Sequence, residues 1–528
     1  MDAALSFANL PSSLHALLDE RADRFGSRTY VITEGGEATY SDLARRSRQF
    51  AGKLMELGAQ PNSRILVLMP ASETYLGLWF AISRIGATEA PINPAYKGLL
   101  LRQLVETADP SLCIVDDSFR EQFDQACEGL IPAERVKRPQ DLDGPSAAEA
   151  ISPSVSPRDI SSIIFTSGTT GQSKGVMISH RHQLSFGQAY VEITGLREDD
   201  TTYNFLPFFH IAAKFVALGT MLAGGRMLLR PTFSVSNFWK DVCTHGVTVC
   251  SAVGGLCHML NSQPRQPDDA DNPLRLIYAV PVPWEFKDAF EQRFGLTLVE
   301  GYGGTENNLV AYSRIGEDTP RGAIGRPSPH FDVRVLREDG FPAEHGEAGE
   351  ICIRPHYPGT MMSGYIGMPE KTLETMGDFW FHTGDRGVMD KNGYLFFLDR
   401  IKDAIRRRGE NISSFEVERV LNACPHVAES AVIPVPSELA EDEVKAVVVL
   451  KEPGSMSEED LFRYAMDSMP YFMVPRYIEF RDSLPRTPTM KIKKTDLRAE
   501  GITNATWDCE RAGLKITRHG LATRATSA

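Results

Sequence analysis

The stretch TSGTTGQSKG, residues 166–175, decides the fold of this chain. It places hydroxyl-bearing residues and one cation, Lys174, around three glycines, directly after the apolar run IIF at 163–165. Glycine lets a backbone turn tightly and approach a ligand, while free N–H groups, hydroxyls and a lysine can surround phosphate oxygens. The lysine stands three residues after Gly171, so the spacing is not that of a GxxxxGK[ST] loop. We predict a phosphate-binding loop at the end of a buried strand, with a flexible Ser/Gly linker as the alternative.

Segments on both sides of this loop alternate between helical and strand patterns. Residues 41–57 form an amphipathic helical pattern, 64–69 a short apolar run, and 73–85 a second helical pattern. This alternation predicts an α/β fold with parallel-type sheets covered by helices. From about residue 320 the sequence becomes strand-rich with glycine turns, which favours a small β-barrel.

With 528 residues the chain is too long for one hydrophobic core. We expect a large N-terminal domain, residues 1–399, made of two parallel-type α/β sheet subdomains plus the small β-barrel. Residues 400–402 are expected to form a hinge, and residues 403–500 a smaller, mobile α+β domain. The weakly patterned tail, residues 501–528, is expected to be partly disordered.

Composition limits the classes of partner. The net charge of −13 argues against broad binding to nucleic acids or acidic membranes. No apolar run is long enough to span a membrane, and no signal peptide is visible. The eight cysteines are scattered without a CxxC pair, which predicts reduced thiols and a cytoplasmic protein. The sequence is compatible with a dimer but does not determine the oligomeric state.

Four further segments carry residues suited to a nucleotide. GYGGTE (301–306) offers an aromatic ring for a base and a carboxylate for Mg²⁺, which takes one or two carboxylates plus phosphate oxygens. HTGD (382–385) puts a carboxylate on a tight turn, where it can bridge ribose hydroxyls. DRIKD (399–403) and PRTPTMKIKK (485–494) add cations. Each segment alone is compatible with an ordinary turn or a solvated surface, and the combination favours a nucleotide site.

In combination these motifs resemble the adenylate-forming superfamily of acyl-CoA synthetases, luciferases and peptide-synthetase adenylation domains, over about residues 10–500. The first loop is similar to its phosphate loop, GYGGTE to its adenine-and-magnesium motif, and HTGD to its ribose motif. DRIKD looks like its hinge, RRGENISSFEVE (407–418) like the following loop, and PRTPTMKIKK like its catalytic-lysine motif. NPAYKG (93–98), GENISSFEVE (409–418) and PSELAEDEVKA (436–446) look closest to the crotonobetaine/carnitine-CoA ligase group.

The resemblance implies a two-step reaction that consumes ATP and CoA and needs Mg²⁺. The carboxylate of an organic acid attacks the α-phosphate of ATP, which gives an acyl-adenylate and pyrophosphate, and the CoA thiol then displaces AMP. The ATP phosphates would be held by residues of the first loop: Thr166, Ser167, Gly168, Thr169, Thr170, Gly171 and Lys174. Tyr302, with Gly303 and Ala279, would lie at the adenine, Thr305 would contact the α-phosphate, and Glu306 would bind Mg²⁺.

The remaining implied roles belong to the second half of the chain. Asp385 and Arg400 would hold the ribose, and Lys402 would be the pivot of the hinge. Gly409 would line the tunnel for the pantetheine arm of CoA, and Lys491 would bridge the carboxylate and the α-phosphate during adenylation. A rotation at the hinge would exchange Lys491 for the loop of Gly409 between the two steps.

Two positions set expectations for the acyl substrate. FFH at 208–210 lies where the superfamily has its acyl pocket and aromatic gate, so His210 is expected at the catalytic site, with core packing as the alternative. Amino-acid-activating relatives have Phe-Asp there, so we expect a non-amino organic acid of medium or bulky size. Lys214, in an otherwise apolar helix, is expected to extend to the surface, with a pocket-facing position as the alternative.

Two departures from the superfamily pattern leave alternatives open. Met490 stands where a glycine usually precedes the catalytic lysine, and residues 278–283 (YAVPVP) replace a Gly-Ala-Pro-like adenine loop. Prolines fix φ and remove donors, so an enzyme that makes the CoA ester from a supplied acyl-adenylate is the second hypothesis. A non-catalytic nucleotide-binding protein is disfavoured because the hinge and Lys491 are retained, and a luciferase-type oxidase is the remaining option.

Overall fold

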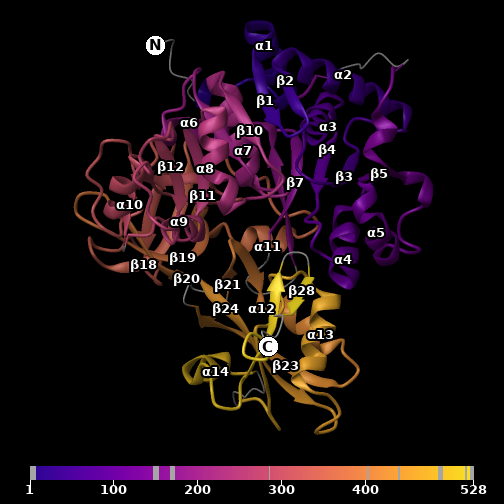
Figure 1. Cartoon of the computed structure of the whole chain (residues 1–528), viewed down its shortest axis with the longest axis vertical. Helices are drawn as coiled ribbons and strands as arrows, with labels where there is room; N and C mark the ends of the chain where they lie inside the picture. Colours follow the sequence, from indigo (N-terminus) through magenta and orange to yellow (C-terminus); the bar gives the residue numbers. More distant parts are fainter. Residues whose placement is uncertain are drawn as a thin grey trace.

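The computed structural model describes residues 7–146, 154–166, 173–284, 286–400, 404–437, 441–485, 492–517 and 520–523. Figure 1 shows a large N-terminal part, drawn from indigo to orange, above a smaller C-terminal domain in orange and yellow. The polypeptide passes from one to the other between Arg400, which ends a strand of the N-terminal part, and Ala404, which begins a strand of the C-terminal domain.

The first sheet of the N-terminal part has the strand order β6-β5-β3-β4-β7-β8 and is parallel except for the β7–β8 pair. Its strands are β3 (Arg64–Leu68), β4 (Thr88–Pro91), β5 (Leu112–Val115), β6 (Val136–Lys137), β7 (Ile160–Thr166) and β8 (Lys174–Ser179). β3 and β5 are nearly continuous apolar runs, as expected for strands that are buried on both faces. The crossovers contain α3 (Glu73–Arg84), α4 (Gly98–Ala108) and α5 (Arg120–Ala126).

The second sheet has the order β13-β12-β11-β9-β10-β1-β2 and is parallel except for the β1–β2 pair. Its strands are β1 (Thr29–Thr33), β2 (Gly36–Thr39), β9 (Thr201–Asn204), β10 (Arg226–Leu229), β11 (Val249–Val253), β12 (Leu276–Val280) and β13 (Thr297–Val299). The associated helices are α1 (Leu14–Phe25), α2 (Tyr40–Glu56), α6 (His180–Thr194), α7 (Ile211–Ala223), α8 (Val235–His245), α9 (Gly254–Asn261) and α10 (Lys287–Phe294). α6 and α7 approach closely at Gly187, where an added Cβ would lie 2.8 Å from the Leu218 Cβ.

The strand-rich region forms two smaller antiparallel sheets. β14 (Gly301–Gly304), β15 (Asn308–Tyr312) and β16 (Arg326–Pro327) make one, and β17 (Phe331–Leu336), β18 (Ala348–Pro355), β19 (Phe381–Met389) and β20 (Leu395–Arg400) make the other. A bridge between Gly325 and Leu395 joins them at one edge. The predicted small β-barrel is therefore present in an open form, and α11 (Pro369–Glu374) lies in the β18–β19 connection.

The C-terminal domain has the α+β character predicted from its sequence. The hairpin β21 (Ala404–Arg407) and β22 (Glu410–Ser413) leads into α12 (Ser414–Asn422) and the sheet of β23 (Val427–Pro436), β24 (Asp442–Leu450), β25 (Tyr477–Phe480) and β26 (Trp507–Asp508). Two further helices, α13 (Glu458–Ser468) and α14 (Lys494–Glu500), accompany the sheet. None of the helices in the described ranges has the length and hydropathy needed to cross a bilayer.

The described part of the segment after Gly501 contains three short strands. β26 pairs with β25, and β27 (Leu514–Thr517) pairs with β28 (Gly520–Thr523). Leu514 and Ile516 are buried in the same apolar cluster as residues of α12 and α13. The sequence of these strands is weakly patterned because they are short and cover an existing core instead of forming one of their own.

The prediction that Lys214 extends to the surface is wrong, and Lys214 does not line a cavity either. Its side chain is fully buried, and its Nζ lies 2.6 Å from Oε2 of Glu89, which is equally buried in β4. Glu89 also accepts hydrogen bonds from Tyr75 (2.5 Å) and Ser162 (2.8 Å), and Lys214 lies over the Trp79 ring at 4.1 Å. A charge can be buried at this depth only when it is paired and hydrogen-bonded, and this network joins α7 to the first sheet.

We expect Lys214→Met to lower the free energy of unfolding by about 3–5 kcal/mol, because it leaves the Glu89 carboxylate buried without its cation. The double variant Lys214→Met/Glu89→Gln should recover most of this loss, since a glutamine side chain keeps hydrogen bonds to Tyr75 and Ser162 without a charge. Urea unfolding followed by tryptophan fluorescence measures both. A double variant less stable than the single variant would contradict this account.

Candidate functional site

The two strands that flank the predicted phosphate loop meet the GYGGTE segment at one place, hereafter the corner. Thr166 ends β7, and its hydroxyl donates to Oε1 of Glu306 at 3.4 Å. The same oxygen accepts a hydrogen bond of 3.0 Å from Tyr365, and Lys174 at the start of β8 lies over the Tyr365 ring at 4.7 Å. Burial and the Glu306 charge raise the pKa of Tyr365, so its hydroxyl remains a donor. Thr166, Lys174 and Glu306, all predicted site residues, are thus brought together.

Glycines make this corner possible because β14 runs against neighbouring backbone. A Cβ on Gly303 would lie 1.9 Å from the carbonyl oxygen of Asn308, and one on Gly301 would lie 2.6 Å from the Tyr278 hydroxyl. The tight turn between β14 and β15 contains Thr305 and Glu306. The amide of Met362 donates to the Glu306 carbonyl at 2.8 Å and fixes this turn from the other side.

The residues predicted at the adenine and ribose also lie side by side. The Tyr302 hydroxyl donates to Oδ2 of Asp385 at 2.7 Å. Asp385 in β19 is the direct partner of Arg400 in β20, so the backbone register places the two predicted ribose residues opposite each other. Gly384 has φ +74°, a left-handed conformation that glycine adopts without strain. One end of the site thus carries an aromatic ring and a carboxylate that share a hydrogen bond.

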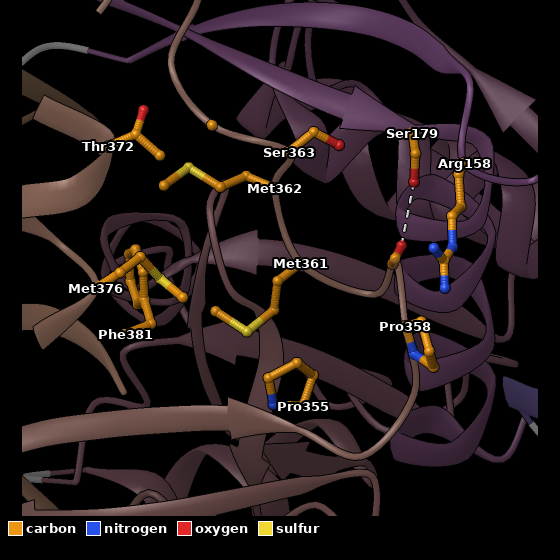
Figure 2. A pocket seen from close by; sticks show the side chains of 12 residues that line it. Arg158, Ser179, Pro355, Pro358, Met361, Met362, Ser363, Thr372, Met376 and Phe381 are labelled. Atoms are coloured by element: carbon orange, nitrogen blue, oxygen red, sulfur yellow. Dashed lines mark hydrogen bonds between the residues drawn. The ribbon is translucent and has the colours of Figure 1, made fainter. Parts of the chain in front are cut away.

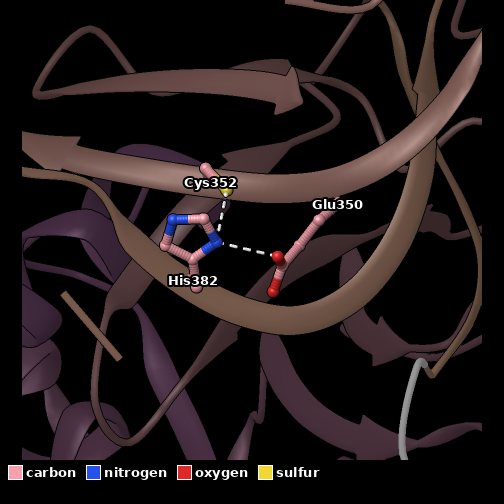
Figure 3. Close-up of side chains that lie close together, drawn as sticks. All are labelled: Glu350, Cys352 and His382. Atoms are coloured by element: carbon pink, nitrogen blue, oxygen red, sulfur yellow. Dashed lines mark hydrogen bonds and ion pairs between the residues drawn. The ribbon is translucent and has the colours of Figure 1, made fainter. Parts of the chain in front are cut away.

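A cluster of Glu350, Cys352 and His382 supports the turn before Asp385 (Figure 3). The ligand atoms of these residues lie within 4.8 Å of one another, as a metal site would require. Nδ1 of His382, however, lies 2.8 Å from one carboxylate oxygen of Glu350, whose other oxygen accepts a 2.8 Å hydrogen bond from the Gly384 amide. Burial and the Glu350 charge raise the pKa of the Cys352 thiol to about 12, so the sulfur is a neutral neighbour. The cluster therefore positions the turn that leads to Asp385.

Beside GYGGTE lies a cavity of about 280 Å³, hereafter the central cavity. Its apolar walls come from α6, α7, β11, β12, β15 and the loop before α7: Phe186, Leu206, Pro207, Ile211, Ala212, Phe215, Ala252, Tyr278, Val280 and Leu309. Gly301, Gly303 and Gly304 contribute backbone, and His210 also lines the cavity. Ala279 lines no part of it, because alternate residues of a strand face opposite sides and its side chain lies in the core.

The C-terminal domain covers this cavity with the tip of the β21–β22 hairpin. Arg408 and Gly409 form a two-residue turn with φ of +55° and +79°, the left-handed pair that tight hairpins favour. Glu410 follows the tip, and its Oε2 lies 2.9 Å from Nε2 of His210. The Ser173 amide donates to Glu416 of α12 at 2.8 Å, which adds a second contact between the domains. Gly409, predicted near the CoA arm, is therefore at the cavity, as is His210.

A second cavity of about 440 Å³ lies behind the loop that carries Tyr365 (Figure 2). Met361, Met362 and Met376 point into it, and Arg158 is the charged side chain at its rim. It is lined by none of the predicted site residues that the structure describes. Its loop nevertheless connects to the site, because the Met362 backbone holds the Glu306 turn.

Several predicted positions lie outside the described residues: Ser167, Gly168, Thr169, Thr170, Gly171, Lys402, Met490 and Lys491. The sequence analysis also missed residues that the structure places at the site, namely Tyr365, Glu350 and Glu410. Glu410 lies within a motif that had been identified, where its charge next to the hairpin glycine was a usable signal. Tyr365 and Glu350 carried no such signal, since each reaches the site from a distant loop or strand.

Both parts of the chain are similar in sequence to known proteins. Residues 18–366 match the sequence model described as AMP-binding enzyme, and residues 416–491 match that of the AMP-binding enzyme C-terminal domain. Crotonobetaine/carnitine–CoA ligase of Salmonella paratyphi A is 29% identical over 511 residues, which cover 92% of this chain and 99% of that protein. The Salmonella paratyphi C protein of the same name is 30% identical over 512 residues, with the same coverage.

Solved structures share the fold over nearly the whole chain. ATP-bound MatB from Rhodopseudomonas palustris has a TM-score of 0.68 at 28% identity, covering 92% of this chain and 98% of its own. The amide bond synthetase McbA from Marinactinospora thermotolerans has a TM-score of 0.80 at 25% identity, covering 92% and 99%. A double mutant of o-succinylbenzoate CoA synthetase from Bacillus subtilis, bound with a product analogue, has a TM-score of 0.81 at 24% identity, covering 92% and 98%.

The close approach of β14 to β15 gives a sharp test of the corner. Gly303→Ala should destabilise the protein by about 1–3 kcal/mol and weaken ATP binding, because the new methyl group must displace the Asn308 backbone. Urea unfolding and calorimetric titration with ATP measure the two effects. Gly35→Ala is the matched control, since its Cβ would meet nothing nearer than 3.7 Å. If the two variants had the same stability and the same affinity for ATP, the assignment of β14 to the ATP site would be refuted.

Proposed function

The chain belongs to the family of AMP-binding enzymes and is an ATP-dependent acid–thiol ligase of the CoA ligase type, and from this premise we propose which residues perform its two steps. The observation that carries the proposal is the corner formed by Thr166, Lys174 and Glu306. β14, which leads to Glu306, carries both Tyr302 of the Tyr302–Asp385 pair and the glycines that line the central cavity. A nucleotide and an acid can therefore meet there.

The first step, formation of the acyl-adenylate, must bring two anions together. The acid carboxylate attacks the α-phosphorus of ATP, the bond to the β-phosphate oxygen breaks, and pyrophosphate leaves. Lys174, the phosphate loop and Thr305 would hold the phosphate oxygens, and Lys491 would bridge both reactants. Glu306 and Thr166 supply hard oxygen donors suited to Mg²⁺. When bound, Mg²⁺ neutralises phosphate charge.

The second step would use the domain arrangement seen here. The hairpin tip at Gly409 reaches the central cavity, and glycine leaves room there for a thin pantetheine arm. The thiol sulfur attacks the acyl carbon and AMP leaves with the electron pair of the broken C–O bond. α14, which begins three residues after Lys491, lies at the end of the C-terminal domain away from the N-terminal part (Figure 1). This separation supports a rotation at residues 400–402 between the two steps.

The second hypothesis, a thioester-forming enzyme with impaired adenylation, is not favoured. This hypothesis was based on Met490 and on the proline-containing loop at 278–283. Tyr278 and Val280 of that loop, however, line the central cavity in regular strand geometry. The family assignment and the CoA ligases that match almost end to end favour a complete ligase.

We further propose that the enzyme works in the cytoplasm, where ATP and CoA are available. The eight cysteines are all free, and seven of them are buried, which fits a reducing compartment. A dimer also stays a proposal, which the molecular mass in solution would test.

Two substitutions should separate the steps. Lys491→Ala should lower acid-dependent pyrophosphate release by about 10²- to 10³-fold, because one positioned charge is lost from the first transition state. CoA-ester formation from a synthetic acyl-adenylate should survive it. Gly409→Leu should do the reverse, since its side chain would fill the path of the pantetheine arm. Pyrophosphate release and CoA-ester formation are measured separately for both variants. If each variant lost both steps to the same extent, the proposed exchange of Lys491 for the loop of Gly409 between the two steps would be contradicted.

The His210–Glu410 contact predicts a pH dependence of the second step. Burial opposes protonation of His210, but the charge and hydrogen bond of Glu410 outweigh it, so its pKa is raised above the usual 6.5. The ion pair is therefore fully present below pH 6.5 and is lost as the pH rises through the raised pKa. The ratio of wild-type to Glu410→Gln rates, from synthetic acyl-adenylate, should be largest at low pH and decline as the pH rises.

This ratio cancels the intrinsic pH dependence of the CoA thiol, which acts equally on both enzymes. Glu198→Gln is the matched control, because Glu198 is an exposed partner of Arg28 and lines no part of the central cavity. Its ratio to wild type should stay flat. A flat ratio for Glu410→Gln as well would show that the pair does not stabilise the docked domain.

A further inference from the structure

The walls of the central cavity carry no charged group except where the C-terminal domain covers it. Among the described lining residues, the charged side chains are Arg406, Arg408 and Glu410, joined by the imidazole of His210. Three of these belong to the covering domain, and His210 is paired with Glu410. Ser251 is the neutral polar group of the wall, and its hydroxyl donates to the Tyr190 hydroxyl at 2.7 Å. A ligand that enters the cavity therefore meets apolar side chains.

The ionisable groups behind the wall are also unavailable to a ligand. Lys214 follows two wall residues of α7 but points to Glu89, which neutralises it. His182 stacks on the wall residue Phe186, and burial lowers its pKa to about 3, so it is uncharged. Glu300 precedes Gly301, but its carboxylate accepts a 3.1 Å hydrogen bond from the Trp284 indole and does not line the cavity. The described N-terminal wall of the cavity therefore offers no cation to a second carboxylate and no anion to a quaternary ammonium. The charged groups at the cavity, Arg406, Arg408 and Glu410, belong to the covering domain.

The shape and chemistry of the wall favour a ring. The rings of Phe186 and Phe215 lie 6.0 Å apart at 12°, and Tyr278 stands at 79° to Phe215 with centroids 6.1 Å apart. Such faces and edges attract a flat aromatic group beyond the effect of buried area. A dry apolar cavity of about 150 Å³ holds benzene, so the central cavity, at about 280 Å³, has room for one substituted ring with its carboxyl group.

We propose that the acid activated by this enzyme is a compact aromatic monocarboxylic acid with no second charge, of the size of a singly substituted benzoic acid. This inference rests on the proposed function, since it names the substrate of that site. The proposed substrate differs from the betaines for which the matching crotonobetaine/carnitine–CoA ligases are named. A buried unpaired charge is costly, so both a dicarboxylate and a betaine would lose binding free energy on entering the cavity.

The test compares four acids with the full-length enzyme: 4-methylbenzoate, hexanoate, succinate and carnitine. Pyrophosphate release and CoA-ester formation give kcat/KM, and calorimetry gives the affinity of the matching acyl-sulfamoyl-adenosine mimic without any chemical step. We expect 4-methylbenzoate and its mimic to exceed the other three by about tenfold or more, because one mismatched group in such a pocket has an effect of this size.

A variant pair tests the wall itself. Phe215→Ala should lower kcat/KM for 4-methylbenzoate by about tenfold and reduce its advantage over hexanoate, because one aromatic wall is removed. Phe290→Ala is the matched control: Phe290 is fully buried in α10 and does not line the cavity. It should leave the ratio between the two acids unchanged even where it lowers stability.

Each outcome bears on one of the two claims. Tightest binding of the succinate, carnitine or hexanoate mimic would overturn the inference and leave the ligase function standing. Tightest binding of the aromatic mimic without pyrophosphate release from any acid would overturn the ligase function and support the inference. An equal change of acid preference in Phe215→Ala and Phe290→Ala would also overturn the inference, since the effect would not come from the wall.

Discussion

The Glu306 carboxylate is held next to the end of β7, where the proposed phosphate loop begins, and the rest of the proposed site is arranged around this placement. A carboxylate beside a polyanion repels it, so the arrangement is stable only if cations are shared between them. The Lys174 ammonium group would be one such shared cation, and a bound Mg²⁺ would be a second. Thr166 and Tyr365 hold the carboxylate in place with hydrogen bonds from two different parts of the chain. The corner therefore needs the first sheet, β14 and the β18–β19 connection to be in register together.

That register depends on close backbone contacts and on one buried charge network. β14 can lie against β15 only because Gly303 has no side chain. On the other side, the Lys214–Glu89 pair joins α7 to the first sheet. α7 supplies Phe215 and Ile211 to the wall of the central cavity. A rigid wall of this kind suits a site that must hold an acid in one orientation while the covering domain changes position.

The contacts of the C-terminal domain differ in kind from those of the cavity wall. They include polar pairs, with His210 facing Glu410 and Ser173 facing Glu416. They also include an apolar cluster shared by both domains, in which the Tyr96 and Phe472 rings lie 6.4 Å apart. Burial raises the pKa of Glu416 to about 6, against the hydrogen bonds from Ser173, so this contact is sensitive to protonation. A rotation of the C-terminal domain would therefore have to break apolar as well as polar contacts. The hairpin tip reaches the cavity without being anchored to an apolar core there.

Local patterns in the sequence determined the α/β class and the helices α2 and α3, because hydrophobic period is a local property. They also placed Thr166, Glu306, Tyr302 and Asp385 in one site through the resemblance of their motifs. Only the tertiary structure decided that Lys214 pairs with Glu89, since the partner lies 125 positions away. The same holds for Tyr365 beside Glu306 and for the neutral cavity wall. Pairing across such separations depends on how the sheets stack, and no local pattern encodes that.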